Sequence, residues 1–258
     1  MPAEIATPAF VLHTRPYGES DRIVTLITEH HGKLAGIAKG AKNSRRRFAG
    51  TLEPFVHIRV VFRQRHATDL AFLVRCELLE ALHPFRRDLE RYAAGSYVLE
   101  LTDRMVLGRE SGGDIYRLVQ DALTVLAGDG LCDPVLRAFE LQLLAASGYA
   151  PVLDRCRGCG TAIGDGSALY LALERGGIVC RSCVRPNEPV RPVSNDTARA
   201  LARLAVEPLA RAGTGDETRH LVEAASIAEH LLRGATTGPL RSRTFLARTR
   251  VDSPGTVR

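Results

Sequence analysis

The stretch FVHIRVVF, residues 55–62, has the pattern of a half-buried β-strand. Ile58 and Val60 would face one side of a sheet and the residues between them the other, because successive side chains of a strand alternate. The segment is rich in β-branched residues, which favour strands. It therefore predicts a strand, and the segments around it indicate the kind of sheet.

Similar apolar segments occupy the rest of the first eighty residues, with turn-forming residues in most of the gaps between them. The predicted strands are 9–14, 22–28, 33–39, 55–62 and 70–79. Five short strands in about eighty residues fit a small barrel. An OB-fold is the leading interpretation, and an SH3-like barrel is the alternative.

From Pro84 onward, apolar residues recur at the spacing of amphipathic helices. The predicted helices cover 85–106, 115–128, 133–148, 194–206 and 217–234. Asp133 is expected to be the N-cap of the third helix, because Pro134 follows it at a position that suits the first helical turn. The last residues, VDSPGTVR, are expected to form a tail.

Two Cys-x-x-Cys pairs stand close together between the third and fourth predicted helices. They are Cys156–Cys159 and Cys180–Cys183. Two residues between the cysteines allow both sulfurs of a pair to reach one ion at about 2.3 Å, and a second pair completes a tetrahedron. The spacing predicts one structural Zn²⁺. The remaining cysteines, Cys76 and Cys132, lie in apolar patterns and are expected to be core residues.

These features predict an α+β chain in which an N-terminal five-stranded OB-fold barrel is followed by a helical domain that carries a four-cysteine zinc-binding insertion. The expected boundaries are 1–80 for the nucleic-acid-binding barrel, 81–150 for the helical domain, 151–192 for the zinc-binding element, 193–250 for C-terminal helices that pack with the helical domain, and 251–258 for the tail.

Positive charge is concentrated at both ends of the chain. The net charge of +6 divides into +4 for residues 1–80, −3 for 81–150 and +5 for 151–258. A polyanion would therefore meet the ends first. No stretch approaches the ~20 apolar residues of a transmembrane helix, and the N-terminus lacks the pattern of a secretory signal. We expect a cytoplasmic protein with no membrane contact.

The most basic segment is KLAGIAKGAKNSRRRFAG, residues 33–50, which holds six cations and no carboxylate. Such a run suits phosphate contacts that carry little sequence information and weaken as salt rises. The predicted DNA-binding residues are Lys33, Lys39, Lys42, Arg45, Arg46, Arg47, Arg63 and Arg65. Candidate side chains for base stacking are few: Tyr17, Phe48 and Phe62. A merely solvated basic face is the alternative.

Catalytic motifs are missing from the sequence. It contains no phosphate-binding glycine loop ending in GKS or GKT, no HExxH and no GxSxG. No histidine has a partner at a catalytic spacing. We therefore expect a protein that is not an enzyme and has no catalytic residues.

Several boxes of the N-terminal region together resemble the bacterial RecO family. These are Tyr17, Glu19 and Asp21 followed by Arg22-Ile23-Val24, then His31–Leu34, Ala38–Lys42 and Leu52–Phe55. The helical middle, the double Cys-x-x-Cys insertion and the closing LRSRTFL (240–246) also look like features of that family.

The resemblance implies a recombination mediator in DNA repair. Such a protein would bind ssDNA and dsDNA, anneal complementary strands without ATP and, with RecR and RecF, help RecA to load onto ssDNA coated by single-strand binding protein (SSB). The C-terminal tail of SSB is a further implied partner, and the protein would associate with the nucleoid when it acts. By resemblance, the cations of residues 33–47 are the DNA-binding set.

Three other functions fit the same residues. An RNA-binding or ribosome-associated module could combine a basic barrel with a zinc knuckle. A nucleic-acid enzyme could assemble its site only in the folded chain. A scaffold could bind RecR alone, without using the basic loop.

Overall fold

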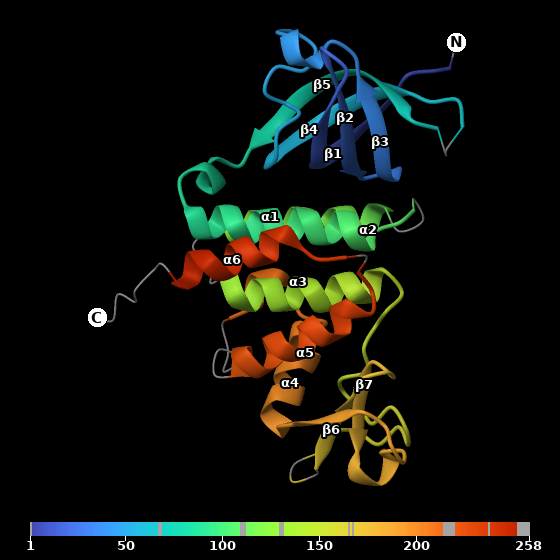
Figure 1. The fold of residues 1–258 in the computed structure, drawn as a ribbon, viewed down its shortest axis with the longest axis vertical. Helices are drawn as coiled ribbons and strands as arrows, with labels where there is room; N and C mark the ends of the chain where they lie inside the picture. Colours follow the sequence, from blue (N-terminus) through green and yellow to red (C-terminus); the bar gives the residue numbers. More distant parts are fainter. Residues whose placement is uncertain are drawn as a thin grey trace. The chain divides into compact units, whose positions relative to one another are not determined.

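A computed structural model describes residues 2–66, 69–108, 112–128, 132–164, 166, 168–213, 220–236 and 238–251. Its contacts divide the chain into two compact units (Figure 1). One comprises residues 1–128 and 238–258, and the other residues 129–237. The predicted tail and the predicted helical residues 217–219 lie outside the described residues, apart from Val251.

The first unit begins with a closed barrel in the strand order β1-β2-β3-β5-β4. Its strands are β1 (Ile5–Tyr17), β2 (Asp21–Thr28), β3 (Gly32–Ala38), β4 (Val56–Arg63) and β5 (Ala71–Ala81). All five predicted strands are confirmed, and closure with β3 and β5 parallel favours the OB-fold over the SH3-like alternative. Alternate side chains such as Val24, Leu26, Ile58 and Val60 are fully buried in its core.

Three helices complete the first unit: α1 (Leu89–Met105), α2 (Gly112–Ala127) and α6 (Arg241–Val251). The Asp88 side chain accepts the backbone N–H of Arg91 and so caps α1. Aromatic rings join the barrel to the segment that leads into α1: Phe55, just before β4, stacks on Phe85 of the short 3₁₀ helix η2 (His83–Arg86), with ring centroids 4.6 Å apart. Phe55 also meets the ring of Tyr92 in α1, at 5.3 Å.

Helix α6 packs on α1, and a side chain of α1 fixes its start. Glu100 accepts hydrogen bonds from the backbone N–H groups of Arg241 and Ser242, at 3.2 and 2.7 Å. These are among the N–H groups that a helix leaves without internal partners. The carboxylate thus supplies a cap from a distant part of the chain, and Leu246 is buried. No helix was predicted here.

The second unit combines helices with a small sheet. Its helices are α3 (Cys132–Ala146), α4 (Asn195–Leu204) and α5 (Leu221–Arg233). The sheet has the order β7-β6-β8, with β6 (Leu169–Ala172), β7 (Gly177–Cys180) and β8 (Val190–Val193). Because α3 begins at Cys132, Asp133 lies in its first turn, so the prediction of Asp133 as N-cap was wrong. Its carboxylate still suits the positive end of the helix dipole.

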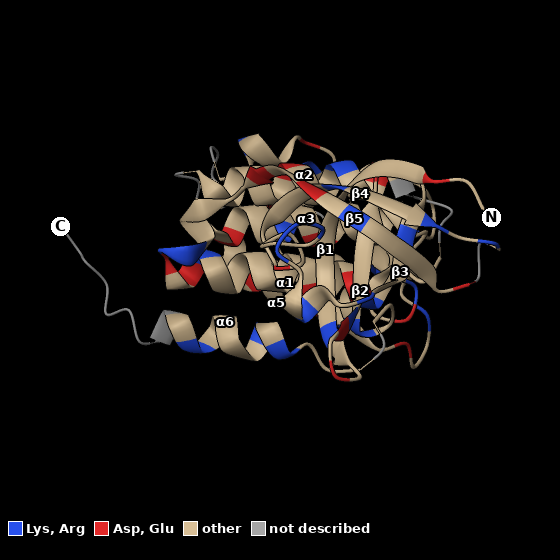
Figure 2. Ribbon diagram, turned by 90° about the horizontal axis from the view of Figure 1, so that it is seen from above, with Lys and Arg blue, Asp and Glu red and all other residues tan. Residues whose placement is uncertain are grey.

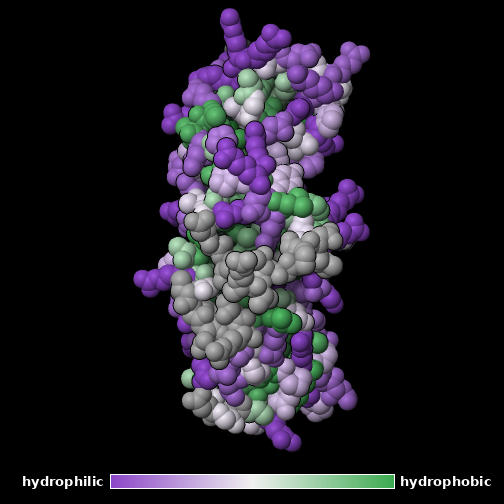
Figure 3. Space-filling view, turned by 90° about the vertical axis from the view of Figure 1, so that its left-hand side faces the viewer, coloured by the Kyte–Doolittle hydropathy of each residue, from purple (hydrophilic) through white to green (hydrophobic). Residues whose placement is uncertain are grey.

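The described residues on the face drawn in Figure 3 are mainly polar. On this face, hydrophobic groups form small areas separated by hydrophilic side chains. None of the helices in the described part of the chain combines the length and apolar character needed to cross a bilayer.

Candidate metal centre and nucleic-acid interface

The four cysteines of the two pairs come together in the second unit. Cys180 ends β7, and Cys183 ends the short 3₁₀ helix η3 (Arg181–Cys183). The four sulfurs all lie within 4.8 Å of one another, and Cys180 Sγ is 3.7 Å from Cys156 Sγ and 4.0 Å from Cys159 Sγ. Sulfurs about 2.3 Å from one tetrahedral ion stand about 3.8 Å apart. The four cysteines could therefore hold a metal ion.

Hydrogen bonds to sulfur prepare this cluster for a cation. Burial raises the pKa of Cys156, but backbone N–H donors, including those of Cys180 and Gly158, outweigh it and lower that pKa to about 6. The pKa of Cys183 rises to about 12, first because of Cys180 and then because of the other two sulfurs. Four thiolates at this distance repel one another, so a bound cation would relieve the repulsion.

Close packing and an ion pair hold together the two cysteine turns, residues 156–159 and 180–183. A Cβ atom on Gly158 would lie 2.7 Å from Cys183 Cβ and 2.8 Å from its sulfur, so only glycine fits there. The guanidinium of Arg175 binds both oxygens of Glu188, at 2.6 and 2.8 Å, and also donates to the carbonyl of Cys183 at 3.1 Å. Such bidentate pairs fix geometry well.

Most of the basic segment lies in the connection between β3 and β4 in the first unit. Lys39, Lys42 and Arg45 to Arg47 are all exposed. We call the connection that carries these five cations the barrel loop. Of the five, Lys39 alone makes an ion pair in the described structure, with Asp21 at 3.7 Å. Figure 2 shows several Lys and Arg residues of the barrel on connections between strands. The loop thus presents charge that carboxylates scarcely neutralise.

The turn between β1 and β2 orders this loop. Asp21 Oδ1 accepts the backbone N–H of Gly40 at 2.8 Å, and that hydrogen bond is the main reason why the pKa of Asp21 is lowered. The ammonium of Lys42 donates to the carbonyls of Gly18 and Glu19, at 3.1 and 2.8 Å. The sequence pattern around Asp21 gives no sign of this link to a loop nineteen residues away.

The other predicted cations are placed differently. Lys33 pairs with Asp103 of α1 at 2.9 Å, and Arg63 pairs with Glu4 at 2.5 Å. Lys33 is near the start of β3 and Arg63 at the end of β4, so both stand at the opposite end of their strands from the barrel loop. Arg65 is exposed beyond β4. The structure thus brings together five of the eight predicted DNA-binding cations.

Two of the three candidate stacking residues are not available. Phe48 and Phe62 are 3% and 1% exposed in the barrel core, so their prediction as stackers was wrong. Phe48 follows three arginines in sequence, but the barrel buries it, and the Arg47 guanidinium lies over its ring at 5.2 Å. Tyr17 remains, at 51% exposed.

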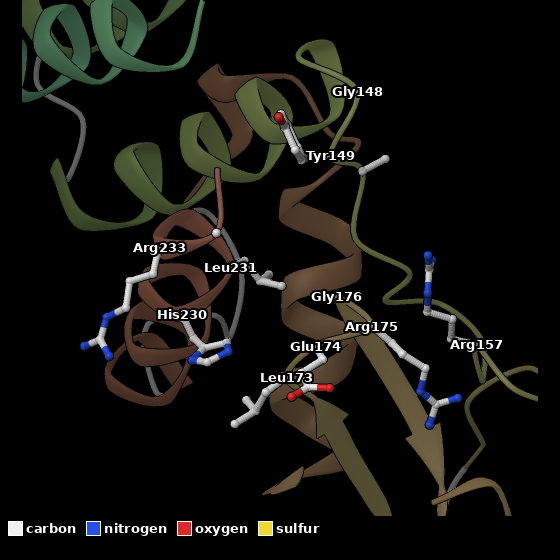
Figure 4. A pocket seen from close by; sticks show the side chains of 12 residues that line it. Gly148, Tyr149, Arg157, Leu173, Glu174, Arg175, Gly176, His230, Leu231 and Arg233 are labelled. Carbon is white, nitrogen blue, oxygen red and sulfur yellow. The ribbon is translucent and has the colours of Figure 1, made fainter. Parts of the chain in front are cut away.

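The second unit also contains an open pocket of about 590 Å³. Figure 4 shows Arg157 and Arg175 of the zinc-binding element across from His230 and Arg233 at the end of α5, with Glu174 between them. Arg175 is paired with Glu188 and Arg233 with Glu229. Among the described residues, the pocket therefore offers less uncompensated charge than the barrel loop, and two helix C-termini nearby oppose an anion.

Comparison with known proteins covers both units. The chain matches the family models "Recombination protein O N terminal" over residues 1–82 and "Recombination protein O C terminal" over residues 86–244. Proteins named DNA repair protein RecO are similar along most of the chain. The one from Anaeromyxobacter sp. (strain Fw109-5) is 37% identical over 240 residues, covering 90% of this chain and 93% of the relative. The one from Syntrophus aciditrophicus is 34% identical, covering 76% of each chain.

Proposed function

Because this chain belongs to the RecO family of DNA repair proteins, we propose that it is a recombination mediator that binds ssDNA and dsDNA and anneals complementary strands without ATP. With RecR and RecF it would help to load RecA onto ssDNA coated by SSB, whose C-terminal tail is a further proposed partner. It would work in the cytoplasm, at the nucleoid.

One observation supports this proposal most: the barrel loop is ordered but hardly neutralised. Four of its five cations make no ion pair among the described residues. Two complementary strands repel through their phosphates, and a basic surface that holds them lowers this repulsion and raises their local concentration. Annealing by this route makes and breaks no covalent bond, so it requires neither a catalytic residue nor ATP.

The four cysteines fit a structural role for one Zn²⁺. A site with four sulfur ligands leaves no coordination position open for a substrate. Cys156, Cys159, Cys180 and Cys183 would hold the ion, which would join the two turns and so keep the small sheet folded. This element lies in a different unit from the barrel loop, and we therefore expect DNA binding by the loop to survive loss of the metal.

The deciding experiment is annealing of two complementary oligonucleotides coated with SSB, without ATP, at low and moderate salt. The test variant is K39Q/K42Q/R45Q/R46Q/R47Q. Its matched control, R117Q/R155Q/R199Q/R203Q/R233Q, removes the same charge from arginines that are paired with carboxylates. We expect the control to anneal like the native protein and the test variant to lose annealing.

The salt dependence of ssDNA binding measures the same contacts directly. Each phosphate contact adds about 0.7 to the slope of log K against log salt. Losing all five would reduce it by up to about 3.5. If the test variant anneals normally, the loop is only a solvated face. If the native protein prefers RNA to DNA of equal length at equal salt, the RNA-binding alternative holds instead.

A further inference from the structure

Helix α6 presents arginines and an aromatic ring on one exposed stripe. Arg241, Phe245 and Arg248 follow one another at helical spacings of four and three, which places them on the same face. Residues 241–251 contain no carboxylate, and α6 shows blue but no red in Figure 2. Since a helix rises about 1.5 Å per residue, the two arginines are separated by roughly 10 Å along it.

A second aromatic residue adjoins this stripe. The rings of Phe245 and Tyr92 meet edge to face, with centroids 6.3 Å apart. Phe245 is 37% exposed and Tyr92 41%, and Leu89, one turn before Tyr92, is 62% exposed. Contact with Phe55 holds the Tyr92 ring from the barrel side. The two rings are thus both fixed in place and accessible to a ligand.

The two arginines of the stripe, Arg241 and Arg248, form no ion pair within the described part of the chain. The carboxylate of Glu100 receives backbone N–H groups at the start of α6. Exposed guanidinium groups beside exposed aromatic rings are the combination that binds single-stranded nucleic acid, where phosphates meet the charges and bases stack on the rings.

We propose that this face of α6 and α1 is a second binding surface for single-stranded DNA, separate from the barrel loop. Arg241 and Arg248 would contact phosphates, and Phe245 and Tyr92 would stack with bases. This inference rests on the proposed function and deepens it, because annealing requires two strands and the first unit would then hold one on each surface. A duplex would fit less well, since its bases are already stacked on one another.

The test uses the full-length protein and two non-complementary oligonucleotides, one with a donor and one with an acceptor dye. Energy transfer between them reports that one protein holds two strands that cannot pair. We expect transfer with the native protein and with the control R117Q/R199Q, which removes two paired arginines. R241Q/R248Q should strongly weaken it while leaving the binding of one strand to the loop.

Phe245→Leu keeps an apolar side chain on α6 and removes only the ring, so it separates stacking from folding. We expect this variant to weaken the binding of the second strand about five- to tenfold and to leave the circular dichroism spectrum unchanged. R241Q/R248Q should also lower the salt slope of the second strand by about 1.4.

Three other results would contradict a second DNA-binding surface on α6 and α1. Native energy transfer in both α6 variants would overturn it. Native DNA binding together with lost binding of an acidic peptide in these variants would make the surface a peptide site instead. A native protein that binds no DNA at all would refute the proposed function, and this result differs from the selective loss of a second strand.

Discussion

Lys33 points its ammonium at the carboxylate of Asp103, with Nζ 2.9 Å from Oδ1. The same ammonium donates to the backbone carbonyl of Asp103. These contacts join the barrel to α1, and both side chains are less than a third exposed. Lys33 therefore differs from the barrel loop although it belongs to the same basic segment of sequence, and a substitution should reveal the difference.

We expect Lys33→Gln to lower the free energy of unfolding by about 1 kcal/mol, because it removes the ion pair and leaves Asp103 with less compensation. The salt slope of DNA binding should not change. Lys42→Gln, the matched control in the loop, should leave the free energy of unfolding nearly unchanged and reduce the salt slope by about 0.7. Urea unfolding followed by circular dichroism suits this chain, which has no tryptophan. A lower salt slope in Lys33→Gln would place Lys33 in the DNA site.

Two substitutions of Asp21 should change the affinity for DNA in opposite directions. Asp21→Asn keeps an oxygen for the Gly40 N–H and removes a negative charge close to the loop, so DNA affinity should rise slightly. Asp21→Ala removes the same charge and also the acceptor, so the loop should lose its anchor and affinity should fall severalfold. Anisotropy of a labelled single strand compares the two. Equal affinities would mean that Asp21 does not order the loop.

Local patterns in the sequence predict the barrel strands and the grouping of the four cysteines well. Alternation along 55–62 and the two-residue spacing of each cysteine pair are properties of neighbouring residues, and they can be read without the fold. Helix α6 could not be found in this way. Its cap is Glu100, 141 residues away, and few of its residues are apolar, so its stability depends on packing with α1.

Phe48 shows a second limit of the sequence. It follows a run of arginines in an exposed connection, which is the pattern of a base-stacking residue, yet the barrel buries it. Burial of one loop residue depends on how the connection crosses the barrel end.

The strands β6, β7 and β8 have four residues each, too few for the alternation of a strand to stand out.

Gly95 should be intolerant of any side chain. A Cβ atom there would lie 2.7 Å from ring carbons of both Phe55 and Phe85, where the barrel packs on α1. Gly95→Ala would ordinarily favour a helix by about 1 kcal/mol, but here we expect a net loss of about 1–3 kcal/mol. Gly108→Ala, where nothing lies within 4 Å, is the control. A variant at Gly95 that is as stable as the native protein would mean that these rings move apart freely.

Gly158 provides a test of the metal site that leaves every ligand in place. Because an added Cβ would strike Cys183, we expect Gly158→Ala to weaken Zn²⁺ binding about 10- to 100-fold, the range seen when groups that support ligands are changed. Competition with a coloured chelator measures the affinity. Gly164→Ala, with no atom within 4 Å, should bind zinc normally. Equal affinities would show that the four sulfurs do not act as one closed site.

His57 should make the first unit sensitive to mild acid. Its Nε2 lies 2.6 Å from the hydroxyl of Tyr116 in α2, whose pKa is raised to about 12 by burial and then by Glu29, so the hydroxyl can donate to a neutral imidazole. Burial lowers the pKa of His57 below 6.5, although the carboxylates of Glu80 and Glu29 oppose this.

Below pH 6.5 the unfolded chain then binds more protons at this histidine than the folded chain does. The stabilisation is therefore complete above about pH 6.5 and is lost as the pH falls toward the folded pKa. We expect the free energy of unfolding to drop between about pH 7 and 5 in the native protein, and to drop less in His57→Gln, which can still accept the hydroxyl but does not titrate. Urea titrations at half-unit pH steps compare the two slopes, and parallel curves would mean that His57 is not held neutral.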